Sequence, residues 1–294
     1  MTNEAPNKTP LVSVIIPFYN NVSWLCEAVD SVLSQKYTER EIIVVNDGSS
    51  EKIAVFLKKY GDRIRYFEKE NGGPASARNY GIKHSNGEYI AFLDSDDLWT
   101  PDKLSVQIDE MLKSGSKWSY TDYETFGVNV QVSYKRMLNA PKGIYTRTSP
   151  YIGTPTVIIE SRFLSENNLL FDECLRYGQD SFLWEKAIHI SPVLYIPVSL
   201  SKVRMRGKNA GRSAIVQLNA RVEIYDKCVE KIPGYKSEKT ALYKLAVSLC
   251  RFGRIFAKKE FKNNRFFELI AKVLFLTPYI LFKIDSKRTV YSRC

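Results

Sequence analysis

The sequence predicts an α/β fold, in which a mostly parallel central sheet is flanked by helices and followed by a C-terminal helical extension. Over residues 11–122, short apolar runs alternate with segments whose apolar residues recur at helical spacing. This alternation is typical of a parallel sheet covered by helices. From residue 215 onward the spacing is helical throughout. A hydrophobic fraction of 44% in 294 residues is enough for a sizeable core.

The first half of the chain gives the clearest elements. Strands are expected where apolar runs occur, at residues 12–18, 41–46, 64–67, 88–93 and 117–121. Helices are expected between them, at about residues 23–33, 53–60, 74–84 and 101–113. Asn21 or Ser23 can cap the first helix, and Gly61 is a typical helix end. Thr100-Pro101 is typical of a helix start.

The second half is less regular. Residues 123–155 contain three glycines and three prolines, so we expect mainly loops there. Strands are expected at residues 156–160, 193–196 and 200–205, and a helix at 179–190. The predicted organisation is a flexible N-terminus (1–10), a domain of two halves (11–122 and 123–214), and a basic amphipathic tail (215–294).

The net charge is concentrated in this tail. The chain carries +11 overall, and residues 215–294 hold 17 Lys and Arg against 7 Asp and Glu. The rest is nearly balanced, with 26 against 25. This distribution argues against a nucleic-acid-binding protein with a basic working face, so no nucleic acid is expected as a partner. It favours a tail that binds an anionic membrane surface.

An apolar segment in the tail predicts how that contact is made. Residues 266–282 are strongly apolar but contain Glu268, Lys272 and Pro278. The uncharged stretch 273–282 is about half as long as the roughly 20 residues that a membrane-spanning helix needs. We therefore expect a helix that lies in the membrane interface. The alternative is a helical hairpin that packs on the core.

The N-terminus and the cysteines predict the compartment. Residues 1–10 are polar and lack the apolar core of a secretory signal. The five cysteines are scattered, as is typical of reduced thiols in the cytosol. We expect a cytoplasmic protein that is peripheral at the inner face of the cell membrane.

The acidic cluster Asp94-Ser95-Asp96-Asp97 is the most informative motif. It follows the expected strand 88–93 directly. In open α/β sheets, ligands bind beyond the carboxyl ends of the strands. Crowded carboxylates repel one another unless a cation joins them, and hard oxygen ligands suit Mg²⁺ or Mn²⁺. The cluster therefore predicts a metal-assisted phosphate site.

Two further strand ends and one loop place polar groups at the same edge. Residues 17–20 are Pro-Phe-Tyr-Asn, and residues 46–50 are Asn-Asp-Gly-Ser-Ser. A carboxylate there can accept hydrogen bonds from a base N–H or a ribose hydroxyl. For Asp47 the alternative is a simple Asx-turn, which Asp-Gly favours. Residues 71–79 form a glycine-rich loop that leads into a helix, and such helix starts bind anions.

In their order and spacing, these motifs resemble the family 2 glycosyltransferases, which are inverting enzymes with the Rossmann-like GT-A fold. The resemblance extends from about residue 11 to 213 and is most specific in the first hundred residues. It implies that Asp47 contacts a uracil, that Arg78 lies near the base or the phosphates, and that Asp94 contacts the ribose. It assigns nucleotide-sugar binding to Pro17, Tyr19, Asn20, Asp47, Arg78, Asp94, Ser95 and Arg206. It assigns a divalent metal, Mn²⁺ or Mg²⁺, to Asp96, and a supporting role to Asp97.

The resemblance also implies a catalytic base. Residues 171–180 are similar to a family segment that ends in Gly-Glu-Asp, whose last residue is the base, and that residue is Asp180 here. A carboxylate suits the removal of a proton from a sugar hydroxyl. The alternative for Asp180 is a helix N-cap or an acid in the first turn of a helix. Gln179 replaces the usual Glu, and the loss of this acidic neighbour predicts a lower pKa for Asp180.

A second departure concerns the metal. Arg206 stands where family members often have a His that helps to bind the metal, and arginine cannot be a ligand because it stays protonated. Either Asp96 and the diphosphate hold the metal with water, or Arg206 itself meets the phosphates.

The expected function is transfer of a sugar from a nucleotide-sugar, with UDP-sugars favoured, to a glycan or lipid-linked glycan of a surface polysaccharide. One alternative is a non-catalytic nucleotide-sugar-binding module, which Gln179 and Arg206 keep open. A sugar-phosphate nucleotidyltransferase is less favoured. It needs a glycine-rich loop with a basic residue near the N-terminus, whereas residues 15–20 are Ile-Ile-Pro-Phe-Tyr-Asn.

Overall fold

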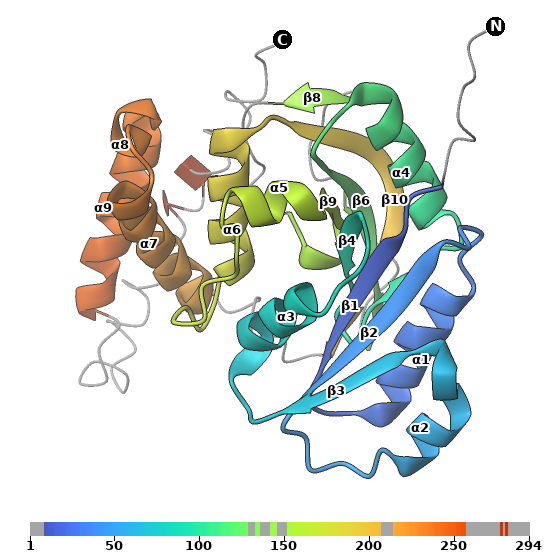
Figure 1. Cartoon of the computed structure of the whole chain (residues 1–294). Helices are drawn as coiled ribbons and strands as arrows, with labels where there is room; N and C mark the ends of the chain where they lie inside the picture. Colours follow the sequence, from blue (N-terminus) through green and yellow to red (C-terminus); the bar gives the residue numbers. More distant parts are fainter. Residues whose placement is uncertain are drawn as a thin grey trace, which may run out of the picture.

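Short runs rich in Val and Ile form one mixed sheet in the computed structural model, which describes residues 9–128, 133–135, 142–145, 152–206, 214–256, 277–278 and 280–281. The strand order is β3-β2-β1-β4-β9-β6-β10-β5 (Figure 1). In that order the strands are β3 (Arg65–Lys69), β2 (Arg40–Asp47), β1 (Val12–Phe18), β4 (Tyr89–Phe92), β9 (Val157–Glu160), β6 (Trp118–Gly127), β10 (Val193–Met205) and β5 (Leu98–Trp99). Neighbours are parallel from β3 to β4 and between β6 and β10, while β9 runs antiparallel between β4 and β6.

Helices cover both faces of the sheet because the strands are apolar on both sides. Val14 and Ile16 of β1 are buried on one face, and Ile15 is buried on the other. The first face is covered by α1 (Val22–Leu33), α2 (Ala54–Tyr60) and α4 (Lys103–Ser114). The second face is covered by α3 (Gly73–Lys83), α5 (Ser161–Glu166) and α6 (Gln179–Ile190). This is the α/β architecture that the sequence predicts.

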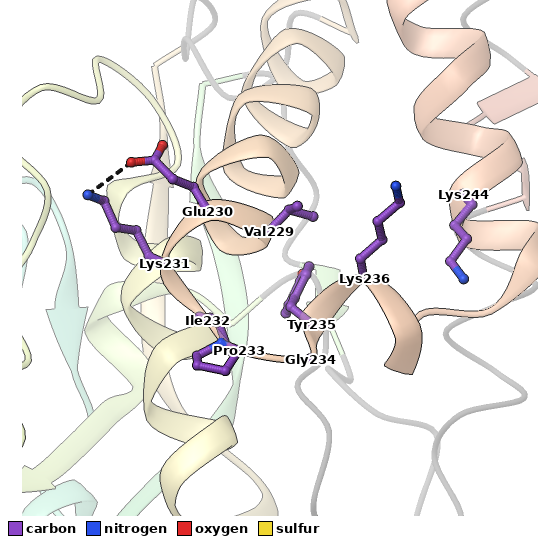
Figure 2. Close-up of a pocket in the computed structure, with 9 residues that line it drawn as sticks. All are labelled: Val229, Glu230, Lys231, Ile232, Pro233, Gly234, Tyr235, Lys236 and Lys244. Atoms are coloured by element: carbon purple, nitrogen blue, oxygen red, sulfur yellow. Dashed lines mark ion pairs between the residues drawn. The ribbon is translucent and has the colours of Figure 1, made fainter.

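The helical extension consists of α7 (Ala214–Lys231), α8 (Tyr235–Glu238) and α9 (Ala241–Phe256), which lie beside α6 (Figure 1). Phe182 of α6 is buried in one apolar cluster with Val222 and Cys228 of α7. Lys239 forms an ion pair with Glu185 of α6 at 3.0 Å. A cavity of about 540 Å³ opens where the three helices of the extension meet (Figure 2).

These contacts show that the described part of the extension packs on the core. The segment 266–282, which we expected in the membrane interface, lies outside the described residues except for 277–278 and 280–281. Leu281 packs against the apolar cluster of α7 and α9, as the packed alternative requires. Within the part of the chain that the structure describes, no helix has the length and apolar character to cross a membrane.

Three expectations about elements are corrected. The helix expected from Pro101 begins at Lys103, because β5 pairs with β10 and the amide of Thr100 donates to the carbonyl of Leu200. The region 123–155, expected as loops, contains the end of β6 and two short strands, β7 (Ser133–Lys135) and β8 (Gly143–Tyr145). The two strands expected between 193 and 205 are one strand, β10, whose register shifts near its middle.

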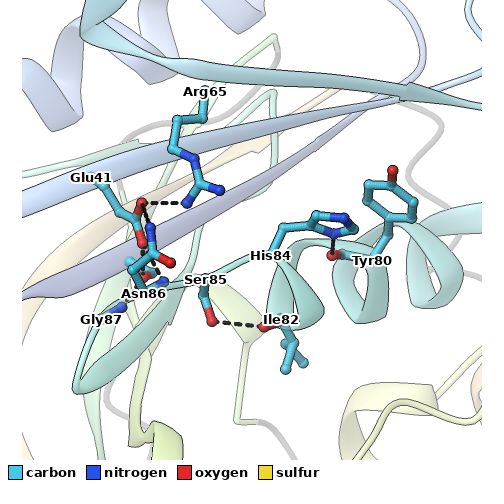
Figure 3. A network of polar contacts seen from close by, with 9 residues as sticks. Glu41, Arg65, Tyr80, Ile82, His84, Ser85, Asn86 and Gly87 are labelled. Carbon is cyan, nitrogen blue, oxygen red and sulfur yellow. Dashed lines mark hydrogen bonds and ion pairs between the residues drawn. The ribbon is translucent and has the colours of Figure 1, made fainter.

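A network of polar contacts joins the amino-terminal ends of the parallel strands β1 to β4 (Figure 3). The carboxylate of Glu41 accepts from Ser13 Oγ at 2.5 Å, from Asn86 N at 2.6 Å and from Arg65 Nη1 at 2.6 Å. The hydroxyl of Ser13 in turn accepts from Gly87 N at 2.8 Å. These bonds tie the starts of the parallel strands together. The opposite edge, where these strands end, is left for the polar motifs.

Candidate active site

The polar motifs surround one cavity at the carboxyl edge of the sheet. β1 lies between β2 and β4, so the order in which successive strands are added to the sheet reverses at β1. Open α/β sheets bind ligands at such a switch point. The cavity has a volume of about 440 Å³. Its lining includes every residue that the sequence assigned to nucleotide-sugar or metal: Pro17, Tyr19, Asn20, Asp47, Arg78, Asp94, Ser95, Asp96 and Arg206. Asp180 is not part of this lining.

The end of β1 supplies one wall, and its turn is fixed by α1. Asn21 adopts a left-handed backbone with φ 71°, and its side chain caps α1 by accepting from Trp24 N. The carboxylate of Glu51 accepts from the amides of Asn21 and Val22, at 2.5 and 2.8 Å. Tyr19 is 50% exposed at this wall. A half-exposed aromatic ring beside a polar cavity offers a flat surface for a base.

Asp47 is buried and holds the glycine-rich loop. Its carboxylate accepts from Gly72 N at 3.0 Å, from Gly73 N at 2.7 Å and from Lys69 Nζ at 2.8 Å. The turn after β2 is closed by Asn46, whose side chain accepts from Ser49 N, so Asp47 is not the Asx-turn residue. Asp47 therefore couples the end of β2 to the start of α3.

Arg78 and Asp94, which both line the cavity, form an ion pair. Arg78 Nη2 lies 2.5 Å from Asp94 Oδ1, and the Arg78 side chain is 7% exposed. The guanidinium also lies 5.3 Å from the ring centre of Phe171. Among the described residues, Nε of Arg78 has no hydrogen-bond acceptor. A buried donor without an acceptor is rare in folded proteins.

The acidic cluster is tied to the end of β10 by two arginines. Arg206 Nε lies 2.9 Å from Asp96 Oδ2. Arg204 donates its backbone amide to Asp97 Oδ1 and its Nε to the carbonyl of Asp96, both at 2.8 Å. Burial raises the pKa of Asp97 well above its usual value, and the charges of Asp96 and Asp94 add to this. Asp97 thus holds the end of β10 through the amide of Arg204, and its supporting role in the site stays a prediction.

Sequence reasoning missed Arg204 and Lys69. Arg204 pairs with Glu27 of α1 at 2.6 Å and lies over the ring of Phe126. Nothing in a run of five cations distinguishes it from its neighbours. Lys69 ends β3 at the same edge as Asp47. That edge position was a signal that could have found Lys69.

The carboxylates of the acidic cluster could hold a metal ion only together with ligands from water and from a bound phosphate group. Across the described residues, no group of three or more His, Cys, Asp or Glu side chains could hold a metal. Asp96 and Asp94 each have one oxygen paired with an arginine, and Asp97 is buried against Arg204. The protein thus offers one or two oxygens. This donor set suits Mg²⁺ or Mn²⁺ that keeps water and takes phosphate oxygens as further ligands.

Asp180 lies in the first turn of α6, which begins after Gly178 with φ 77°. Its Oδ1 accepts from Ser181 N at 2.7 Å, and its Oδ2 accepts from the Thr154 hydroxyl at 3.3 Å. Burial raises its pKa, opposed mainly by the positive charge of Arg78. The effect expected from Gln179 is relative to a Glu at that position and stays a prediction, whereas burial, which the sequence did not indicate, sets the direction of the shift in the pKa of Asp180. Arg78 and Asp94, which line the cavity, act on the pKa of Asp180 with opposite signs.

Comparison with known proteins follows this geometry. The sequence model of Glycosyl transferase family 2 matches residues 13–168. An uncharacterized glycosyltransferase of Rickettsia bellii is 43% identical over 208 residues, which are 67% of this chain and 29% of that protein. The chain thus spans less than a third of that relative. The Escherichia coli UDP-Glc:alpha-D-GlcNAc-diphosphoundecaprenol beta-1,3-glucosyltransferase WfgD is 34% identical over 178 residues, 59% of this chain and 68% of that protein.

Solved structures show the same fold. Staphylococcus aureus TarS 1-349, in complex with UDP-GlcNAc, superposes with a TM-score of 0.65 at 19% identity, over 96% of this chain and 93% of that chain. The mannosyltransferase PcManGT of Pyrobaculum calidifontis, in complex with GDP-Man and Mn²⁺, gives 0.62 at 14% identity, over 95% and 89%. At these identities the likeness establishes the GT-A fold alone. Since the family model covers more than half of its length, the chain belongs to the family 2 glycosyltransferases.

Proposed function

We propose that this protein is an inverting glycosyltransferase that moves a sugar from a UDP-sugar to a hydroxyl of a glycan or lipid-linked glycan. The observation that carries the proposal is the cavity of about 440 Å³ in which Asp47, Arg78, Asp94 and Asp96 meet. The electrostatic link from Arg78 to Asp180 joins this cavity to a base. The names of WfgD and of the TarS complex support a UDP-sugar as donor and a lipid-linked glycan as acceptor.

The reaction assigned to Asp180 is general-base catalysis. The acceptor oxygen attacks the anomeric carbon from the face opposite to the diphosphate, and the bond from that carbon to the diphosphate oxygen breaks. Attack from that face inverts the configuration, Asp180 takes the proton of the acceptor hydroxyl, and UDP leaves. The raised pKa of Asp180 strengthens it as a base.

The negative charge that develops on UDP requires positive partners. Arg78 has a buried Nε without an acceptor, and Arg206 is 50% exposed at the rim. Donors aimed in advance at a developing charge stabilise it by several kcal/mol, on the order of 3 for one donor. A divalent metal held at Asp96 would supply further charge neutralisation to the diphosphate. We propose Mn²⁺ or Mg²⁺ there, sharing the site with Arg206.

Uridine recognition is assigned to the β1 and β2 walls. Uracil presents one N–H donor between two carbonyls, and Asp47 is an acceptor with Lys69 as a donor beside it at 2.8 Å. Pro17 and Tyr19 line the same part of the cavity. Asn20, Ser95 and Asp94 are placed for ribose and phosphate oxygens, with Asp94 on the ribose.

We also propose that the helical extension binds an anionic lipid surface on the cytoplasmic side. The cavity in Figure 2 is lined by Lys231, Lys236 and Lys244, of which Lys231 pairs with Glu230 at 3.0 Å. Such lysines are each worth about 1 kcal/mol near an anionic surface. The double variant Lys236→Glu/Lys244→Glu should lose flotation with phosphatidylglycerol vesicles. Equal flotation of the variant and the wild type would contradict this assignment.

The donor assignment is tested by thermal shift with UDP-glucose, UDP-GlcNAc, GDP-mannose and CTP. A ligand present at about a hundred times its Kd stabilises by roughly 2.7 kcal/mol. The proposal predicts a rise in Tm with UDP-sugars and slow release of UDP without acceptor. A rise without any UDP release would favour the non-catalytic binding module. Pyrophosphate formation from a sugar phosphate and a nucleoside triphosphate would favour the nucleotidyltransferase.

A further inference from the structure

A short turn next to β9 brings one buried hydroxyl to Asp180. The 3₁₀ turn Thr154–Thr156 precedes β9 directly. Thr154 is 4% exposed, and its Oγ1 lies 3.3 Å from Asp180 Oδ2. The other oxygen of Asp180 accepts from the backbone amide of Ser181. Among the described residues, Thr154 is the one side chain that a hydrogen bond joins to Asp180.

The first half of this turn is fixed by two donors from the neighbouring strands. The carbonyl of Pro155 accepts from Trp99 Nε1 at 2.9 Å and from Ser201 Oγ at 2.8 Å. Trp99 belongs to β5 and Ser201 to β10, and the two residues pair with each other in the sheet. The position of Thr154 is therefore set by the sheet rather than by the loop before it.

The second half is fixed by two buried polar side chains of α4. The carbonyl of Thr156 accepts from Gln107 Nε2 at 3.0 Å and from Lys103 Nζ at 3.3 Å. Both side chains are completely buried. The amide of Thr156 donates to Gly153 O at 2.9 Å, which closes the turn. Burial of this many polar groups is costly unless each is satisfied, so the network needs a compensating benefit.

Asp180 is held firmly from its own side as well. A Cβ at Gly178 would lie 2.5 Å from Ile224 Cδ1 of α7, so the start of α6 packs closely on the helical extension. Leu183 and Trp184, one turn further along α6, are buried in the core. Two rigid elements thus meet at the hydrogen bond between Thr154 and Asp180.

We propose that Thr154 is a positioning residue for Asp180. Its hydroxyl donates to Oδ2, orients the carboxylate, and favours the ionised form that can accept a proton from the acceptor hydroxyl. Arg78 and Asp94 are the charged residues that also act on Asp180, with opposite signs, and neither restrains its rotation by a hydrogen bond. This inference rests on the assignment of Asp180 as the base in the proposed function.

The test compares Thr154→Val with Thr154→Ser and with a matched control in the same turn. Thr154→Val keeps the shape and removes the donor, and Thr154→Ser keeps the donor. The control is Thr156→Val, because the Thr156 hydroxyl is also buried but donates to Gly153 O at 2.7 Å. The readouts are UDP release from UDP-glucose and UDP-GlcNAc as a function of pH, UDP affinity, and the Asp180 titration followed by ¹³C carboxyl NMR.

Thr154→Val should lower kcat about ten- to hundredfold, since a hydrogen bond to a charged group is lost, with UDP affinity unchanged. The Asp180 titration should move to higher pH. Thr154→Ser should restore both, and Thr156→Val should lower Tm without moving the titration. An unchanged kcat and titration in Thr154→Val would overturn the inference. Should that variant not fold, the same titration in Thr154→Ala decides.

Asp180→Asn in the same assay separates the two proposals. Wild-type turnover in Asp180→Asn would remove the base assignment itself, whatever Thr154→Val does. Lost turnover in Asp180→Asn together with normal turnover and titration in Thr154→Val would remove only the role of Thr154.

Discussion

Arg206 Nε lies 2.9 Å from Asp96 Oδ2, so a cation of the protein itself occupies the carboxylate assigned to the metal. Arg206 is 50% exposed, and ion pairs of that kind contribute about 1 kcal/mol or less. The pair is therefore weak enough for a metal and a diphosphate to replace it. The ion pair with Arg206 offsets part of the negative charge of the acidic cluster before the donor binds.

Replacement of Arg206 by His should strengthen metal binding. Arg206→His removes the competing cation and restores a potential ligand, so the Mn²⁺ concentration for half-saturation should fall by about fivefold or more. Mn²⁺ titration of the UDP-bound protein, followed by electron paramagnetic resonance, measures this. Arg251→His is the control, because Arg251 pairs with Asp226 in the extension. Unchanged Mn²⁺ affinity in Arg206→His would contradict the competition.

The acidic limb of the pH–rate profile should report Asp180. Burial raises its pKa, and the base must be ionised, so kcat falls as the pH drops through a value above the usual ~3.9 of Asp. Arg78 opposes this rise. Arg78→Met should therefore move the limb to higher pH still. A limb that stays in place in Arg78→Met would show that the titrating group is not Asp180.

Loss of Asp47 should weaken donor binding by two routes. Asp47→Ala removes the acceptor proposed for uracil and releases the amides of Gly72 and Gly73. Loss of a hydrogen bond to a charged group costs about 1.5–3 kcal/mol, so UDP affinity should fall at least tenfold. Isothermal titration calorimetry with UDP measures the loss. Lys69→Met keeps the bonds from Asp47 to the loop amides and should lose less UDP affinity. Equal losses of UDP affinity in both variants would argue against the role of Asp47 in holding the loop.

Lys103 should make stability depend on pH. Burial holds its pKa well below its usual value. Between that lowered pKa and the unfolded value near ~10.4, unfolding takes up a proton, so the free energy of unfolding rises with pH by up to about 1.4 kcal/mol per unit. This contribution is complete above the unfolded pKa and is lost as the pH falls through the folded one. Urea unfolding at pH 8, 9 and 10 should show the slope in the wild type but not in Lys103→Met, and parallel curves would contradict it.

The elements that could be predicted from sequence are those with local signals. β1 matches its apolar run at residues 12–18, and α1 has the expected cap at Asn21. The start of α4 could not be predicted, because the pairing of Trp99 with Ser201 across a hundred residues overrides the local Thr-Pro signal. The edge strands β7 and β8 are three residues each and lack any apolar period.

In the candidate site too, residues with a local sequence signal could be predicted and residues placed by distant contacts could not. Asp47 and Asp94 meet in the cavity because the parallel strands β2, β1 and β4 end at one edge, and α3 brings Arg78 to the same place. Thr154 belongs to no motif, and its proposed role depends on a turn that α4, β5 and β10 hold in place. The sequence shows only which residue stands beside Asp180, whereas burial, a property of the fold, decides the direction of the shift in the pKa of Asp180.

We propose above all that Asp180 is the base of a glycosyl transfer whose donor binds in the cavity. Asp180→Asn keeps the size of the side chain, replaces one of its two accepting oxygens by a donor, and cannot take a proton. Its matched control is Asp226→Asn, an exposed acid on α7. Turnover of the preferred UDP-sugar and the Kd for UDP are measured for both.

Asp180→Asn should lose turnover by at least about a hundredfold, within the range that a general base contributes, while its UDP affinity and Tm stay close to those of the wild type. Asp226→Asn should retain both turnover and affinity. Wild-type turnover in Asp180→Asn would contradict the account.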